Sequence, residues 1–116
     1  MSAQAQLLSR REQLEAAIWQ ALREVEDPEI PVSVVGLGLI VSVAYRGADR
    51  TAALQITFTA MGCPAMEFIQ EDIRDAVLRV PEVDRVDIEV VWDPVWTKDR
   101  IRSDARATMR RLGIVV

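Results

Sequence analysis

The sequence predicts an α+β fold, a two-layer sandwich with elements in the order α-β-β-α-β-α. Helices are expected to pack on one face of a small three-stranded mixed sheet. Apolar residues recur at helical spacing in three segments and alternate with polar residues in others. Half of the residues are apolar and 28% are charged, as in a folded globular protein. A length of 116 residues suits one domain, 1–116, with its core at about 14–113.

The first predicted helix covers residues near 7–25. Its apolar residues fall on one side at helical spacing: Leu14, Ile18, Leu22 and Val25. The prolines at positions 28 and 31 end it, because proline lacks a backbone N–H and favours extended conformations in the residue before it. Gly36 and Gly38 then predict a sharp bend before the first strand.

Residues 39–45 and 51–59 are predicted to form a β-hairpin. The first segment is rich in apolar residues, and the second alternates apolar and polar residues, as half-buried strands do. Residues 46–50, which include Gly47, supply the turn between them.

The second half of the chain predicts a helix, a strand and a final helix. Pro64 suits the first turn of a helix that ends at Pro81, and alternation over 86–92 predicts a third strand, with Trp92 in phase with its core side. Thr97 is the expected cap of the third helix, and Gly113 its end. The inner face of that helix is expected to hold Ile101, Ala105, Thr108 and Leu112.

Composition excludes several classes of function. The chain has no histidine, which removes Ser-His-Asp and Cys-His catalysis and histidine-built zinc sites. The net charge of -4 argues against nucleic-acid binding. One cysteine rules out an intrachain disulfide, and no apolar run reaches the ~20 residues of a membrane span. Without a signal-peptide pattern at the N-terminus, we expect a cytoplasmic protein with no membrane partner.

The single cysteine, Cys63, is the leading candidate for chemistry. It lies where a strand pattern ends and a helical pattern begins, and the positive end of a helix dipole favours a thiolate. Glu67 follows one helical turn later, so the two side chains could offer two ligands to iron or zinc. The structural alternatives are a cysteine that only packs and a glutamate that only faces solvent. Because two ligands are fewer than a four-coordinate site needs, any metal would require a second chain, a partner or an external thiol.

Candidate binding residues surround Cys63 in the predicted topology. Thr59 and Gly62 share its segment, and Gly62 permits the close approach of a ligand or another backbone. If the second and third strands are parallel, Asp93 lies at the same end of the sheet as Cys63. Asp27, in a proline turn, could join an acidic rim there, although aspartate before proline commonly only organises a turn. Trp96 is an expected exposed or interface aromatic.

Four motifs together resemble the iron-sulfur cluster assembly-associated family that includes SufT-like and PaaD-like proteins. They are Asp-Pro-Glu-Ile-Pro-Val at 27–32, Val-Gly-Leu-Gly-Leu-Ile at 35–40, the segment 57–64, and Trp-Asp-Pro-Val-Trp-Thr at 92–97. The resemblance implies that Cys63 is the family's characteristic thiol and that Asp27 and Asp93 match its acidic positions. This chain departs from the family at Gly36, where aspartate is common. It also lacks the cysteine-rich C-terminal extension of fuller PaaD-like chains, which favours the SufT-like type.

The resemblance implies a non-enzymatic accessory factor in iron-sulfur cluster assembly or delivery, with Cys63 as a transient ligand to a cluster or to iron and no tightly bound cofactor. Its expected partners are iron-sulfur assembly proteins or apo-client proteins, and a homodimer is plausible because a small sheet leaves open edges. The alternative is a protein-protein adaptor for assembly of a metal-dependent oxygenase, with Cys63 structural. Such an adaptor would act through Trp96 and the line of Arg102, Arg106 and Arg110.

Overall fold

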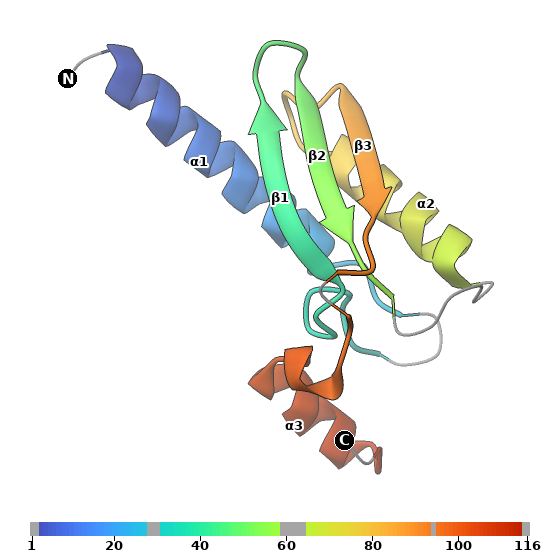
Figure 1. Cartoon of the computed structure of the whole chain (residues 1–116). Coiled ribbons are helices and arrows are strands. Elements are labelled where there is room, and N and C mark those ends of the chain that lie inside the picture. Colours follow the sequence, from blue (N-terminus) through green and yellow to red (C-terminus); the bar gives the residue numbers. More distant parts are fainter. Residues whose placement is uncertain (1–2, 28–30, 59–64, 94, 115–116) are drawn as a thin grey trace.

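The computed structural model describes residues 3–27, 31–58, 65–93 and 95–114 (Figure 1). Its elements follow the predicted order, and the α+β fold class is confirmed. They are α1 (Ala3–Leu22), β1 (Ile40–Arg46), β2 (Thr51–Ile56), α2 (Ala65–Leu78), β3 (Arg85–Val90), a short 3-10 helix η1 (Lys98–Arg100) and α3 (Ser103–Arg111). None of the helices in these residues is both long and apolar enough to span a bilayer.

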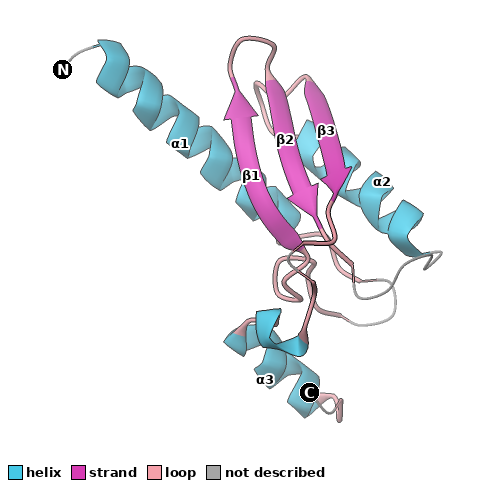
Figure 2. Ribbon diagram, viewed as in Figure 1, coloured by secondary structure: helices cyan, strands magenta, loops and turns pink. Residues whose placement is uncertain are grey.

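The sheet has the strand order β1-β2-β3 and is mixed (Figure 2). β1 and β2 form an antiparallel hairpin with Val43 opposite Leu54, whereas β2 and β3 are parallel with Leu54 opposite Ile88. The crossover through α2 permits this parallel pairing. Because parallel strands end on the same side, the chain leaves β2 and β3 at one common end of the sheet.

The hydrophobic core lies between the sheet and the two long helices. α1 and α2 cover the same face of the sheet and contact each other, while the opposite face is open (Figure 1). The largest fully buried apolar side chains include Ile18, Leu22, Leu54, Ile56 and Ile73. Burying each of them stabilises the fold by about 1.5–3 kcal/mol. Residues whose spacing predicted these elements therefore form the core.

α3 lies beyond the end of the strands and packs against residues 31–39. Ile101 and Ala105 are buried as predicted, but Leu112 is 52% exposed and Met109 takes the inner position. The prediction for Leu112 was wrong because α3 ends at Arg111, so Leu112 is the C-cap and no longer follows the helical spacing that would place it on the inner face, seven residues after Ala105. Thr97 precedes η1 and makes no capping hydrogen bond with its side chain, so the predicted cap of α3 was also wrong.

Candidate functional site at one end of the sheet

Residues 96–101 tie the C-terminal part of the chain to the loop 31–39. The Trp96 indole Nε1–H donates to the Leu37 carbonyl oxygen at 2.8 Å, and the Arg100 Nε–H donates to the Gly38 carbonyl oxygen at 2.8 Å. The Arg102 backbone N–H adds a bond to the Gly36 carbonyl oxygen, also at 2.8 Å. These bonds hold the start of α3 against the loop that precedes β1.

The assignment of the two tryptophans differs from the prediction. Trp96, expected as an exposed or interface aromatic, is partly buried and hydrogen-bonded to the loop. Trp92, expected in the core, is 39% exposed. The reason is that β3 ends at Val90, so the alternation that would have turned Trp92 inward stops two residues earlier. Trp96 is thus a structural anchor of this end of the sheet.

Both glycines of the loop are required by close packing. A Cβ at Gly36 would lie 3.0 Å from the Ala105 Cβ and 3.2 Å from Val32 Cγ1. The aspartate common in the resembling family would therefore require the side chains of Ala105 and Val32 to shift. Gly38 has φ +74°, and a Cβ there would lie 2.3 Å from the Arg100 carbonyl oxygen. Residues 96–105 therefore pack against the bend that these glycines predicted.

Three predicted site residues, Cys63, Thr59 and Gly62, lie outside the described residues. Glu67 is exposed in the first turn of α2, where the positive end of the helix dipole stabilises a carboxylate. Among the described residues, no group of three or more Cys, Asp or Glu side chains is placed to hold a metal ion. A metal role for Cys63 and Glu67 therefore stays a prediction.

The two predicted acidic residues differ in their surroundings. Asp93 is exposed just after β3, at the end of the sheet where β2 also ends. Asp27 is partly buried, and its backbone N–H donates to the Val32 carbonyl oxygen at 3.0 Å. The backbone makes this bond and the carboxylate does not, so both interpretations of the Asp27 side chain stay predictions.

Thr57 was not predicted as a site residue. Its side chain is fully buried, and its hydroxyl has no hydrogen-bond partner in the part of the chain that the structure describes. Its backbone N–H donates to the Leu39 carbonyl oxygen at 2.8 Å. Thr57, which follows β2, is therefore bonded to the residue that precedes β1. Its polar place in the alternating segment 51–59 is typical of an exposed position, and the sequence signal for a role is that Thr57 begins the motif 57–64. Burial of such a hydroxyl costs about 1–3 kcal/mol.

Apolar side chains are exposed in both segments that leave the common end of β2 and β3. Phe68, in the first turns of α2, is 65% exposed, and Val95, after β3, is 74% exposed. Trp92 lies between β3 and Val95. We call Phe68, Trp92 and Val95 the apolar rim. Exposed apolar side chains mark protein-protein contact sites where they form a contiguous patch, and these three belong to the two segments that leave one end of the sheet.

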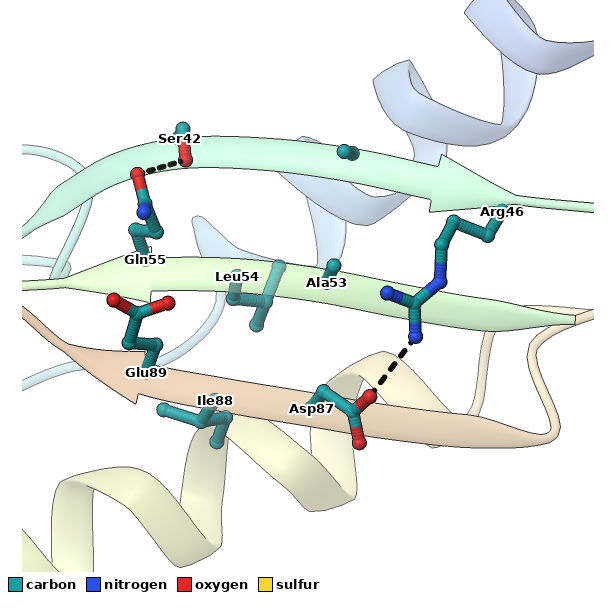
Figure 3. Close-up of a pocket in the computed structure, with 9 residues that line it drawn as sticks. Ser42, Arg46, Ala53, Leu54, Gln55, Asp87, Ile88 and Glu89 are labelled. Atoms are coloured by element: carbon teal, nitrogen blue, oxygen red, sulfur yellow. Dashed lines mark hydrogen bonds and ion pairs between the residues drawn. The ribbon is translucent and has the colours of Figure 1, made fainter. Parts of the chain in front are cut away.

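The open face of the sheet carries a shallow hollow of about 490 Å³ (Figure 3). The Ser42 hydroxyl donates to Gln55 Oε1 at 2.9 Å near one end of this hollow. Near the other, a guanidinium nitrogen of Arg46 lies 3.0 Å from a carboxylate oxygen of Asp87.

Asp87 also pairs with Arg85 across 3.0 Å. Partial desolvation raises the pKa of the Asp87 carboxyl, but hydrogen bonds and charge from Arg85 and Arg46 outweigh it and hold that pKa below its usual range. The charges at this end of the hollow are therefore neutralised within the chain, and we assign them to cross-strand pairing.

The chain matches known proteins over most of its length. The family model described as iron-sulfur cluster assembly protein matches residues 15–90. A Porphyromonas gingivalis protein named Fe-S protein maturation auxiliary factor is 45% identical over 103 residues, covering 89% of this chain and 94% of that protein. The Bacillus subtilis protein named Fe-S protein maturation auxiliary factor YitW is 35% identical over 98 residues, covering 84% and 95%.

A solved structure shares the fold. The crystal structure of a domain of unknown function, DUF59, from Bacillus anthracis superposes with a TM-score of 0.79 at 34% sequence identity. The match covers 93% of this chain and 99% of that one. With a family model spanning α1 to β3 and relatives matched over nearly their whole length, the chain belongs to the iron-sulfur cluster assembly protein family.

Proposed function

We propose that this protein is an accessory factor that helps to assemble iron-sulfur clusters or deliver them to client proteins, without turning over a metabolite itself. The observation that carries the proposal is the apolar rim, Phe68, Trp92 and Val95, whose exposed side chains belong to the segments that leave the common end of β2 and β3. Family membership supports the cluster as the cargo, and the rim supports a protein as the recipient.

Client docking is the role we assign to the apolar rim. Since β2 and β3 are parallel, the segments that follow them start from one end of the sheet. Phe68 comes five residues after Cys63 in the sequence, and Trp92 two residues after β3. A client bound to these side chains would lie close to the cysteine segment, which shortens the path for transfer.

Cys63 is the proposed transient ligand. It precedes α2 by two residues, and a thiol near a helix N-terminus is biased towards the thiolate that binds iron. A single thiolate supplies one of the four ligands that a cluster normally has. Its incomplete coordination favours release to a client over permanent storage.

Anaerobic reconstitution with iron and sulfide tests the ligand role. We expect the wild type to acquire the visible absorbance of an iron-sulfur chromophore and to activate a purified apo-dehydratase that requires a [4Fe–4S] cluster. Cys63→Ser should lose both properties, and Glu67→Gln should lose cluster binding only if Glu67 is a second ligand. Unchanged cluster content and client activation in Cys63→Ser would contradict the ligand role.

The docking role has its own test. Phe68→Ala should retain the chromophore but activate the apo-dehydratase more slowly, since it removes a contact and no ligand. The matched control is Leu112→Ala, which truncates another exposed apolar side chain, at the residue that follows α3. Equal activation by both variants would remove Phe68 from the docking surface.

An adaptor with a structural Cys63 is the second candidate. Arg106, which that alternative used as a docking residue, instead hydrogen-bonds through its guanidinium to the carbonyl oxygens of Ile101 and Lys98, at 3.2 and 2.5 Å. Its role in holding η1 to α3 weakens its case as a free docking residue. The adaptor predicts that Cys63→Ala retains client activation, and Arg110→Glu is a better test of basic docking because Arg110 is exposed.

A further inference from the structure

The outward side of α2 is exposed and carries net negative charge, because the four exposed carboxylates of Glu67, Glu71, Asp72 and Asp75 outnumber one exposed arginine, Arg74. Glu67, Glu71 and Asp75 lie one turn apart along this side, and the apolar side chains of Phe68 and Leu78 flank them, 65% and 42% exposed. Like charges at this spacing repel and destabilise a helix. No ion pair involving these three carboxylates occurs among the residues that the structure describes.

The outward face of α3 has the opposite charge. Arg102 and Arg110 are exposed on one side of the helix, Arg111 is exposed on the other side, about two and a half turns after Arg102, and Leu112, 52% exposed, follows the helix. None of the three arginines forms an ion pair with another described residue. Arg106, between them, is held by backbone carbonyls and by Asp99.

Glu12, Glu24, Glu89 and Asp93 likewise form no ion pair among the described residues. Several other charged side chains are paired within the chain, for example Arg10 with Glu82 and Arg50 with Asp84. The α2 and α3 faces cannot neutralise each other in one molecule, because α2 lies along the sheet and α3 lies beyond its end (Figure 1). A second copy could bring them together.

The charges on the two helices also match in spacing. Glu67 and Asp75 are eight residues apart, as are Arg102 and Arg110, and eight residues span about 12 Å of helix. When the helices lie side by side, both carboxylates can therefore meet both guanidiniums. Phe68, Leu78 and Leu112 can then exclude water beside the ion pairs.

We propose that the protein forms a reciprocal homodimer in which the α2 face of each copy binds the α3 face of the other. A two-fold axis makes the two contacts equivalent and closes the assembly at two copies. Since the interface depends on exposed ion pairs, it should be weak and sensitive to salt. Phe68 and Glu67 also belong to the docking and ligand roles proposed above, so the dimer must dissociate before a client binds. Loss of dimerisation would leave client activation intact, which keeps the two proposals separable.

Sedimentation velocity on the full chain measures the association. At about 0.01 M salt, where the Debye length is roughly 30 Å, we expect dimers, and at about 1 M salt, where it is roughly 3 Å, we expect monomers. A monomer at low salt would overturn the proposal. A dimer whose dissociation constant does not change with salt would overturn it as well.

Charge reversal identifies the two faces. Glu71→Arg/Asp75→Arg makes both faces basic, and Arg102→Glu/Arg110→Glu makes both acidic, so each variant alone should raise the dissociation constant at least about tenfold. An equimolar mixture should form heterodimers, because each face then meets its opposite. Circular dichroism checks that both variants remain folded.

The matched control is Glu12→Arg/Glu89→Arg, which reverses two exposed carboxylates on α1 and on the open face of the sheet. It should dimerise like the wild type. Dissociation of this control, or failure of the mixed variants to associate, would place the interface elsewhere and overturn the proposal.

Discussion

Replacing Gly38 by alanine should strongly destabilise the protein, because this residue lets the C-terminal segment approach the loop before β1. Its φ of +74° costs a residue with a side chain about 1–2 kcal/mol. The new Cβ would lie 2.3 Å from the Arg100 carbonyl oxygen and 2.6 Å from the Arg100 Cβ, so the backbone must move apart.

That movement also breaks the hydrogen bond from the Arg100 guanidinium to the Gly38 carbonyl oxygen. A hydrogen bond to a charged group contributes about 1.5–3 kcal/mol. We therefore expect Gly38→Ala to lower the free energy of unfolding by about 3–5 kcal/mol. Urea denaturation measures this, and with a slope of about 1–3 kcal/mol per M the midpoint should fall by more than about 1 M.

Two other glycines separate backbone strain from crowding. Gly113 has φ +80° but nothing within 4 Å of its Cβ position, so Gly113→Ala should cost about 1–2 kcal/mol or less. Gly47 has neither problem, and Gly47→Ala should be neutral or stabilise by up to about 1 kcal/mol. If Gly38→Ala were no more destabilising than Gly113→Ala, the close contact with Arg100 would not restrain this end of the sheet.

Three further substitutions test other contacts. Trp96→Phe removes the indole donor to the Leu37 carbonyl oxygen and should lower the free energy of unfolding by about 1 kcal/mol in urea; an unchanged midpoint would show that the bond does not anchor the segment. Thr57→Val removes the buried hydroxyl that lacks a partner and should raise the melting temperature, with a gain of about 1 kcal/mol, whereas a loss would indicate that the hydroxyl is bonded. For Asp87, the carboxyl pKa is lower in the folded than in the unfolded protein, so its stabilising effect is present above the unfolded pKa of about 3.9 and lost as pH falls through the folded pKa. Asp87→Asn should therefore be less stable than the wild type at pH 7 but converge with it in acid, and a constant difference across this range would contradict the ion pairing.

The sequence was sufficient to predict the element order because each element depends on a local pattern. Helical spacing of Leu14, Ile18 and Leu22 selects the buried side of α1, and alternation selects the buried side of β2. The contacts of the candidate site depend on tertiary structure instead. The hydrogen bond from Trp96 to Leu37 joins residues 59 positions apart, which no local pattern reveals.

Gly36 illustrates the same limit. In sequence it is an exception to the family's common aspartate, and in the structure it is the surface against which Ala105 packs. Likewise, the burial of Thr57 depends on the loop and the strands around it, while its sequence pattern indicates a solvent-facing side chain. The ion pair of Asp87 with Arg46 required the register of all three strands, because Arg46 lies on β1 and Asp87 on β3.

The most direct test of the proposed function is the activity of iron-sulfur enzymes in cells that lack this protein. We predict that a deletion strain contains normal amounts of [4Fe–4S] dehydratase polypeptide with reduced activity. The wild-type gene should restore that activity, and Cys63→Ser, expressed at the same level, should not. Full dehydratase activity in the deletion strain would contradict a role in cluster assembly or delivery, and full restoration by Cys63→Ser would contradict the role of its thiol.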